Sequence, residues 1–255
     1  MFEIAHALSS HLSNDVTLFI GLSIIFGLII GSFLNVVIYR MPKILTRQWQ
    51  QNCLALQCKE MPDQAPLTLA TPRSACPTCN HIITAIENIP AISYLFLGGK
   101  CKSCKTRISI RYPLVEILTG ALLGLVAYQF GYTYTTLFAW IFILALITLS
   151  LIDFDTQLLP DDITLPLLWL GLLFNLNNGF TDLKSAVIGA AIGAWFGWQL
   201  LPAVVLLSAV LGAIIGIGLM WLKGKSSQTA ISFGPFLALG GIAALFFGQH
   251  LAGLY

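Results

Sequence analysis

Charged side chains are scarce in this chain: Asp, Glu, Lys and Arg make up 9% of its 255 residues, against 57% hydrophobic residues. Soluble globular domains carry about 25% charged residues, so the composition excludes that class. Acidic residues are absent from Leu183 to Tyr255. Lys and Arg are absent before Arg40, so the first apolar segment lacks the basic start of a secretory signal peptide and is expected to remain as an anchor.

Apolar segments occupy most of the chain. Six of them approach the length of about 20 residues that crosses a hydrocarbon core of about 30 Å, and a seventh is shorter. The six cover approximately 16–38, 113–131, 134–152, 163–178, 203–222 and 232–252, and the seventh covers 185–201. The chain is therefore predicted to be an all-α polytopic membrane protein with six to seven transmembrane segments.

Positive charge is concentrated in one polar segment. Ten of the thirteen Lys and Arg residues lie between Arg40 and Arg111, where the only acids are Glu60, Asp63 and Glu87. Positively charged loops remain on the cytoplasmic side of a membrane, so we expect this segment to be cytoplasmic. Anionic lipid or nucleic acid would suit the same charges. The topology rule explains them without a ligand, and no nucleic-acid partner is expected.

Composition predicts three parts. Residues 1–42 form an N-terminal transmembrane anchor, 43–112 a small polar domain inserted after the first span, and 113–255 a polytopic membrane domain. Pro42 is expected to end the first helix, because proline cannot donate the hydrogen bond that continues it.

Two polar side chains stand near the ends of predicted spans. Asn35 is interpreted as a polar contact between helices rather than as a catalytic group, since amides in spans commonly hydrogen-bond across helices. Glu116 follows the start of the second span by about one turn. It favours the helix N-terminus electrostatically or pairs with Arg111, and a catalytic role is the alternative.

Two Cys-x-x-Cys pairs stand in the polar domain, Cys76 with Cys79 and Cys101 with Cys104. Each tight turn presents two sulfurs to one point, so four thiolates at this spacing predict a tetrahedral zinc site in a zinc-ribbon-like domain. Two disulfides are the alternative, which a reducing cytoplasm disfavours. A domain this small has little core, so zinc binding would supply much of its folding energy. The two other cysteines of the chain are expected to be free thiols.

Four carboxylates interrupt the apolar part of the chain, at Asp153, Asp155, Asp161 and Asp162. An ionised Asp at the bilayer centre costs about 2.5 to 3.5 kcal/mol, so acids near that depth usually face a watery cleft and mark chemistry. Loop and helix-cap chemistry also explains Asp155 and Asp162. Asp153 ends an apolar run on its own and is the catalytic candidate. Counting spans from the polar domain places this stretch on the cytoplasmic side as well.

Several motifs, taken together and in order, resemble the type IV prepilin peptidase family over nearly the whole chain. They are 31–42, the paired Cys-x-x-Cys, 88–90, 111–116, 151–169 and 232–235, the last reading Ser-Phe-Gly-Pro. The resemblance implies a bacterial inner-membrane aspartic endopeptidase, a hydrolase that removes the leader of type IV prepilins and related pseudopilins. It also implies methylation of the new N-terminus with S-adenosylmethionine. It makes Asp153 the first catalytic aspartate and the four cysteines of the two pairs the zinc ligands.

One family motif has no counterpart in this chain. The family's second catalytic aspartate lies in a Gly-x-Gly-Asp motif followed by Phe-Lys, and the sequence contains none. Residues 186–202 look like the family's helix before the motif joined to its helix after the motif. We therefore expect that one spanning helix of about 20 residues and its loop are missing from the family's eight spans. A full span at 185–201 would also place Lys223 and Lys225 outside, against the positive-inside rule, whereas a shallow or re-entrant segment would not.

The missing aspartate leaves two functional hypotheses. The aspartic peptidase mechanism that the resemblance implies needs one carboxylate to deprotonate water and a second carboxyl group to donate a proton to the scissile carbonyl. Asp153 alone cannot do both. The first hypothesis is a prepilin peptidase and N-methyltransferase with cleavage in question. The alternative is an inactive membrane scaffold that binds prepilins or pilus and secretion assembly partners. Intramembrane acids would also permit a transporter, but the zinc-ribbon pattern and the lack of a paired inverted repeat argue against it.

Overall fold

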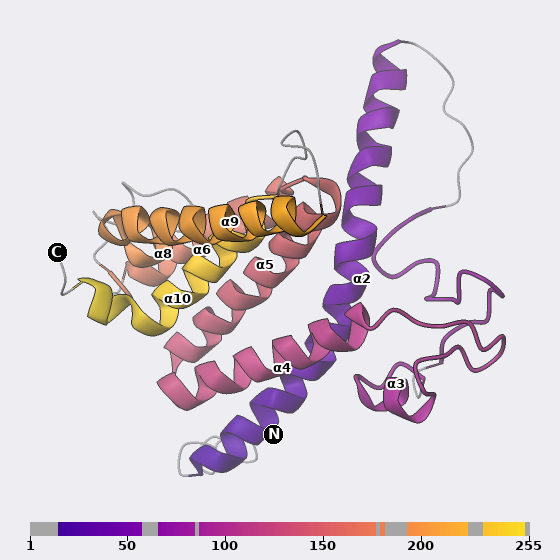
Figure 1. The fold of residues 1–255 in the computed structure, drawn as a ribbon, viewed down its shortest axis with the longest axis horizontal. Coiled ribbons are helices and arrows are strands. Elements are labelled where there is room, and N and C mark those ends of the chain that lie inside the picture. The colour runs from indigo at the N-terminus through magenta and orange to yellow at the C-terminus, as the bar shows by residue number, and fades with distance from the viewer. Residues whose placement is uncertain are drawn as a thin grey trace. The chain divides into compact units, whose positions relative to one another are not determined.

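A computed structural model describes residues 15–57, 66–84, 87–176, 179–181, 193–223 and 232–252 of the chain. Within these ranges the structure is helical, and β-structure is limited to two isolated bridges (Figure 1). The chain divides into two compact units, Met1–Tyr132 and Thr133–Tyr255, here named unit 1 and unit 2. The predicted all-α membrane fold, with a cysteine cluster after the first long helix, is confirmed.

Helix α2, Val16–Leu56, extends well beyond the span predicted at 16–38. The prediction that Pro42 ends this helix is wrong, because α2 continues past it to Leu56. Proline removes one backbone donor from a helix at a cost of about 3 kcal/mol. The residues after it include several good helix formers, which favour continuation. One turn after the proline, the hydroxyl of Thr46 donates to the Pro42 carbonyl at 2.8 Å.

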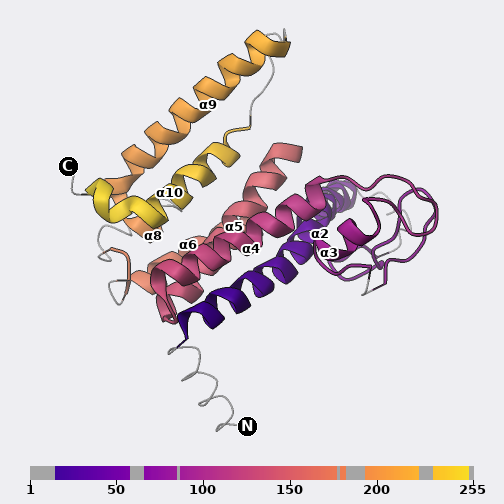
Figure 2. The same cartoon turned by 60° about the horizontal axis from the view of Figure 1, so that its bottom comes forward.

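Helix α4, Arg111–Phe130, packs against α2 in unit 1 (Figures 1 and 2). Glycines allow the two backbones to approach closely. A Cβ atom added to Gly27 would lie 2.7 Å from the Cα of Gly120, and one added to Gly31 would lie 2.8 Å from the Cα of Glu116. Small residues spaced by four are the usual means of close helix packing in membranes, where lipid offers no hydrophobic drive for association.

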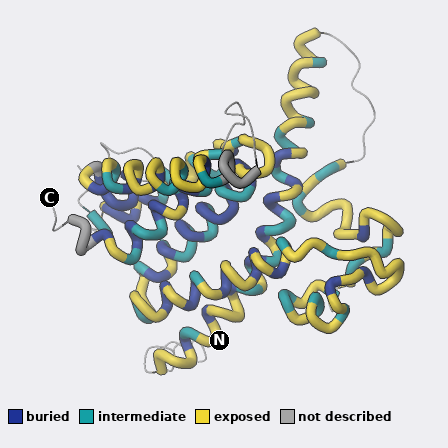
Figure 3. The backbone as a smooth tube through the Cα atoms, viewed as in Figure 1, coloured by how far each residue is buried: buried dark blue, intermediate teal, exposed yellow. Residues whose placement is uncertain are grey.

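Unit 2 contains five α-helices and one 3-10 turn within the described residues. They are α5 (Tyr134–Thr156), α6 (Asp161–Asn175), α8 (Gly193–Phe196), η1 (Trp198–Leu200), α9 (Leu201–Lys223) and α10 (Gly234–Ala252). Buried residues run along α5, which packs against both α6 and α10 (Figure 3). An aromatic cluster forms the core around the fully buried Trp195, whose ring centroid lies 4.8 Å from that of Phe142 and 6.1 Å from that of Phe174.

Four described helices are long and apolar enough to cross a membrane, namely α2, α4, α5 and α9. They correspond to four of the predicted spans. Helix α6, with 15 residues, and the described apolar part of α10, Gly234–Gly248, fall below that length. The total of six to seven spans stays a prediction.

The segment predicted at 185–201 is described only from residue 193 onward. That part is not one regular helix, because α8 ends at Phe196. Gly197 follows with a φ of 80°, in the left-handed region, and the 3-10 turn η1 comes next. The predictions on residues 186–192 and on Lys225 fall outside the described residues.

Candidate metal centre and candidate active site

Two turns of the same design carry the four cysteines. In the first, the amide of Asn80 donates to the carbonyl of Cys76 at 2.9 Å, and in the second the amide of Lys105 donates to that of Cys101 at 3.0 Å. Asn80 and Lys105 both have positive φ, 54° and 60°, which turns the chain back after each pair. The repeated geometry follows from the Cys-x-x-Cys spacing, since both sulfurs of a pair must point to the inside of one turn.

The four sulfurs converge on one point. Cys76 Sγ lies 3.7 Å from Cys104 Sγ, Cys79 Sγ lies 3.9 Å from Cys101 Sγ, and all four lie within 4.8 Å of one another. A zinc ion bound by four sulfurs at about 2.3 Å spaces them about 3.8 Å apart, so the cluster fits a tetrahedral zinc ion. These distances are far above the roughly 2.05 Å of a disulfide. The disulfide alternative is therefore wrong for the four clustered cysteines, which are free thiols here.

Thr106 lowers the pKa of one of the four thiols, that of Cys104. Its hydroxyl lies 3.2 Å from the Sγ of Cys104. This contact is the main cause that lowers the pKa of the Cys104 thiol to about 6. Metals bind the thiolate form, so a lowered pKa favours metal binding at neutral pH.

Glu87 links the two cysteine turns, a role that sequence reasoning missed. Its carboxylate lies 3.1 Å from His81 Nε2, next to the first turn, and 3.3 Å from Lys102 Nζ, inside the second. The amide of Thr84 donates to the same carboxylate at 3.0 Å. This amide, followed by His81 and Lys102, holds the pKa of Glu87 at about 2. The only available sequence signal was that Glu87 is the single acid between Arg73 and Arg111.

Arg40 anchors the polar domain to α2. The residue is buried, and its guanidinium donates to the carbonyls of Thr68 at 3.0 Å, Leu69 at 3.2 Å and Pro72 at 2.5 Å. The planar fork of five donors explains why one arginine can hold three carbonyls of a turn. Sequence reasoning treated Arg40 only as a topology-setting charge.

The two polar groups near the span ends both make contacts at this end of α4. Asn35 donates from Nδ2 to the carbonyl of Tyr112 at 3.1 Å, which confirms the predicted contact between helices. Glu116 is buried, and its Oε2 accepts a hydrogen bond from the amide of Ala91 at 2.7 Å. Glu116 therefore binds the loop of the polar domain that precedes helix α3, Ile92–Phe96, a partner that its position in the sequence did not indicate.

Asp153 is the buried member of the four-carboxylate stretch, whereas Asp155, Asp161 and Asp162 are exposed. It lies in the last turn of α5, and its Oδ2 accepts hydrogen bonds from the amide of Gly234 at 2.8 Å and from the hydroxyl of Ser232. The structure thus joins Asp153 to the Ser-Phe-Gly-Pro motif.

Gly234 permits this contact, since a Cβ atom there would lie 2.5 Å from Asp153 Oδ2. Both hydrogen-bond partners of Asp153 among the described residues are donors, and neither is an acid. Asp161 and Asp162 instead occupy the first turn of α6, where acids favour the positive end of the helix dipole.

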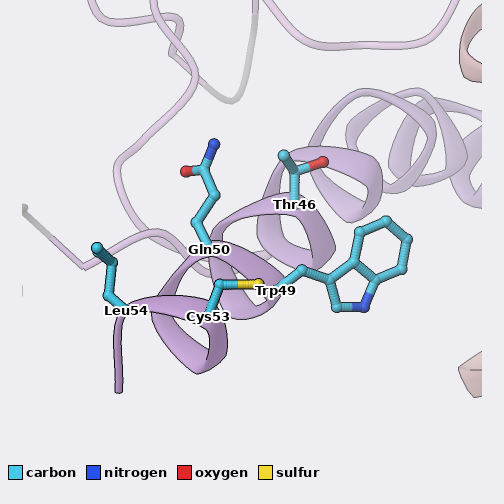
Figure 4. Close-up of a pocket in the computed structure, with 5 residues that line it drawn as sticks. All are labelled: Thr46, Trp49, Gln50, Cys53 and Leu54. Carbon is cyan, nitrogen blue, oxygen red and sulfur yellow. The ribbon is translucent and has the colours of Figure 1, made fainter. Parts of the chain in front are cut away.

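A surface hollow on α2 shares no lining residue with either site (Figure 4). It is lined by Thr46, Trp49, Gln50, Cys53 and Leu54, all from the part of α2 beyond Pro42. Because a single helix supplies its whole lining, the hollow offers neither a cluster of acids nor a set of metal ligands.

Comparison with known proteins identifies relatives along the whole chain. The Bacterial Peptidase A24 N-terminal domain matches residues 25–130, and the Type IV leader peptidase family matches residues 140–194. The Prepilin leader peptidase/N-methyltransferase of Aeromonas hydrophila is 43% identical, over 100% of this chain and 97% of the relative. The protein of the same name from Pseudomonas aeruginosa is 41% identical over 97% of each chain. No solved structure matches the chain.

The alignment with the Aeromonas hydrophila relative is longer than this chain. It runs over 289 positions and includes all of the 255 residues, so at least 34 aligned positions have no residue here. A membrane-crossing helix takes about 20 residues, so the absent positions exceed the length of one span. The match to the leader peptidase family ends at residue 194, inside the segment 186–202.

Proposed function

The chain belongs to the prepilin leader peptidase/N-methyltransferase family, and on this premise we propose that it binds type IV prepilins or pseudopilins in the bacterial inner membrane but cleaves their leaders slowly. The observation that carries the proposal is the lone carboxylate of Asp153, which is held by two donors and by no second acid among the described residues. The polar domain and the Asp153 stretch are proposed to face the cytoplasm, where the basic leader of a prepilin lies.

Asp153 is proposed as the surviving catalytic aspartate. Its Oδ2 is occupied by Ser232 and Gly234, so Oδ1 is the oxygen left to bind the attacking water. An aspartic peptidase also needs a second carboxyl group that protonates the departing amine or the scissile carbonyl. One carboxylate cannot be base and acid in the same step, so the chemical step loses general acid catalysis.

The length of the alignment, the end of the family match and the lack of late acids support the loss of the second aspartate. At least 34 aligned positions of a close relative are absent, the family match ends at residue 194, and no acid occurs from Leu183 onward. We therefore propose that the absent positions include the family's Gly-x-Gly-Asp motif. The four-span count among described helices is consistent with the loss of a helix but does not locate it.

Zinc is proposed on Cys76, Cys79, Cys101 and Cys104, where it would supply folding energy rather than catalysis, because four thiolates close its coordination sphere. Around it, Glu87 joins the two turns through His81 and Lys102, and Thr106 favours the thiolate form of Cys104. Use of S-adenosylmethionine is proposed from the names of the relatives alone.

A leader-cleavage assay in proteoliposomes tests the proposal. The unmodified chain should cleave a prepilin on the order of 10²-fold or more slowly than the Aeromonas hydrophila relative, as expected when general acid catalysis is lost. Inserting the segment that the relative has and this chain lacks should restore cleavage. Asp153→Ala in that restored chain should remove the cleavage again. Robust cleavage by the unmodified chain that disappears in Asp153→Ala would show that another carboxylate has the second role.

A scaffold that binds prepilins without any cleavage is the second candidate, and the packing of unit 2 favours it. Asn175 is fully buried and donates to the carbonyls of Ala194 and Trp195, while its Oδ1 accepts from the amides of Phe180 and Thr181. The region next to the proposed gap is therefore well packed. Crosslinking of a prepilin to the unmodified chain, with cleavage no greater than that of Asp153→Ala, would support the scaffold. Absence of crosslinking with intact protein, or cleavage that Asp153→Ala removes, would reject it.

A further inference from the structure

Helix α3 and the residue Ile89 before it expose several large apolar side chains close together in sequence. The exposed fractions are 50% for Ile92, 77% for Leu95 and 87% for Phe96, and Ile89 just before the helix is 41% exposed. Exposed apolar clusters on a small domain mark an interaction surface. Five residues make α3 too short to be stable by itself, so its position depends on what holds its two ends.

The N-terminal end of α3 is held at membrane depth by α4. Ala91, the residue before α3, donates its amide to Glu116 Oε2 at 2.7 Å. Glu116 comes five residues after Arg111, the first residue of α4, which corresponds to about 7.5 Å along a helix. The loop before α3 therefore reaches below the charged start of the span, at the end of α4 where the polar domain lies (Figure 1).

Helix α2 gives an independent measure of the same depth. Gly31 contacts the backbone of α4 at Glu116, since a Cβ atom on Gly31 would lie 2.8 Å from the Glu116 Cα. Gly31 comes eight residues before Tyr39, which precedes the first basic residue of the chain, and this separation is about 12 Å along the helix. The backbone at Glu116 thus lies roughly 7 to 12 Å inside the polar boundary marked by the two helices, and its carboxylate reaches from there to the amide of Ala91.

The C-terminal end of α3 leads directly to basic residues. Two glycines with positive φ, Gly98 and Gly99, turn the chain into Lys100, which pairs with Arg107 in an antiparallel bridge. Both basic residues are exposed. The Gly99 amide donates to the Tyr94 carbonyl at 2.8 Å, which ties α3 to the segment that leads into the second cysteine turn.

From this arrangement we propose that α3 is an interfacial anchor: Leu95 and Phe96 insert among the lipids beside α4, and Lys100 and Arg107 bind anionic phospholipid headgroups. An apolar face that enters 5 to 10 Å into the interface and is flanked by basic residues is the usual form of such a contact. The depth of the Glu116 backbone overlaps that range, and the Glu116 carboxylate binds the residue just before α3, so α3 starts next to the α2 and α4 pair. The anchor holds the cysteine cluster at the bilayer surface, whether or not the chain cleaves leaders.

Fluorescence quenching of the full chain in vesicles of phosphatidylethanolamine and phosphatidylglycerol tests the anchor. An environment-sensitive dye is attached to Phe96→Cys in a Cys53→Ser and Cys58→Ser background, with one label per chain verified by mass spectrometry. Leu56→Cys, at a position that is 86% exposed at the far end of α2, is the matched control. The dye at 96 should be quenched by lipids brominated in the upper acyl chain and be several-fold less sensitive to aqueous iodide than the dye at 56.

Leu95→Cys serves as a second labelling site and should behave as position 96 does. Equal iodide quenching at 96 and 56 would overturn the proposal. Protection at 96 that appears only when a prepilin is added would also overturn it, and would make α3 a docking surface for substrate. Replacing phosphatidylglycerol by phosphatidylcholine should weaken the protection, and unchanged protection would refute the role of Lys100 and Arg107.

Discussion

Because α2 and α4 approach each other closely, a single methyl group added at Gly27 should lower the stability of the protein. A Cβ atom there would lie 2.7 Å from the Gly120 Cα and 3.0 Å from the Thr119 carbonyl oxygen, whereas ordinary contacts begin at 3.4 Å. Both neighbours are backbone atoms, which cannot rotate away as a side chain can. The two helices must therefore separate by about 0.7 Å locally, and gaps of that size forfeit a quarter to a half of a dispersion contact.

The magnitude follows from comparison with Gly21, which lies in the same helix and has no atom within 4 Å of an added Cβ. Replacing either glycine by alanine improves helix propensity by the same amount, about 1 kcal/mol, so this term cancels between the two variants. Overpacking at Gly27 costs about 1 to 3 kcal/mol. Gly27→Ala should thus be less stable than Gly21→Ala by that difference, which corresponds to a Tm lower by roughly 2 to 10 °C.

Thermal unfolding of the two variants in the same detergent measures this difference, and hydrogen exchange of peptides from residues 111–130 locates it. Exchange should rise in α4 for Gly27→Ala and stay unchanged for Gly21→Ala. Equal Tm values with equal exchange would refute the reasoning, because they would mean that the backbones of α2 and α4 are not in contact at Gly27.

Three further predictions concern the metal centre and the core of unit 2. Purified without chelator, the chain should contain about one zinc ion, and Cys76→Ser should abolish zinc binding while Cys53→Ser leaves it intact; a zinc-free protein with a folded polar domain would contradict this. Glu87→Gln should speed zinc removal by a chelator, because the amide loses the ionic contacts that join the two cysteine turns; an unchanged rate would show that the turns hold independently. Asn175→Ala should lower the free energy of unfolding by several kcal/mol. The reason is that buried backbone groups lose their hydrogen-bond partner, and each such group costs about 1 to 3 kcal/mol. A calorimetric Tm equal to that of the wild type would disprove this prediction.

The local sequence pattern was sufficient to predict a structural feature wherever the physical cause of that feature is local. The apolar segments at 16–38, 113–131 and 134–152 became α2, α4 and α5, because a chain in lipid must satisfy its backbone groups within each segment and forms helices. The Cys-x-x-Cys spacing likewise predicted the sulfur cluster, since each pair lies within one turn. The sequence alone also shows that no acidic residue follows Asp182.

Contacts between distant residues were decided by the tertiary structure alone. Asp153 could be chosen as the candidate acid from its apolar surroundings, but Ser232 and Gly234 follow it by 79 and 81 residues, and no periodicity links such positions. The pairing of Glu116 with Ala91 depends in the same way on how the polar domain folds back onto α4. The end of α2 is a different case, because there two local effects compete: Pro42 disfavours a helix while the residues on both sides of it favour one. Helix propensity and motif spacing act within a few residues, whereas the partners of a buried polar group are selected by packing, which only the folded chain brings about.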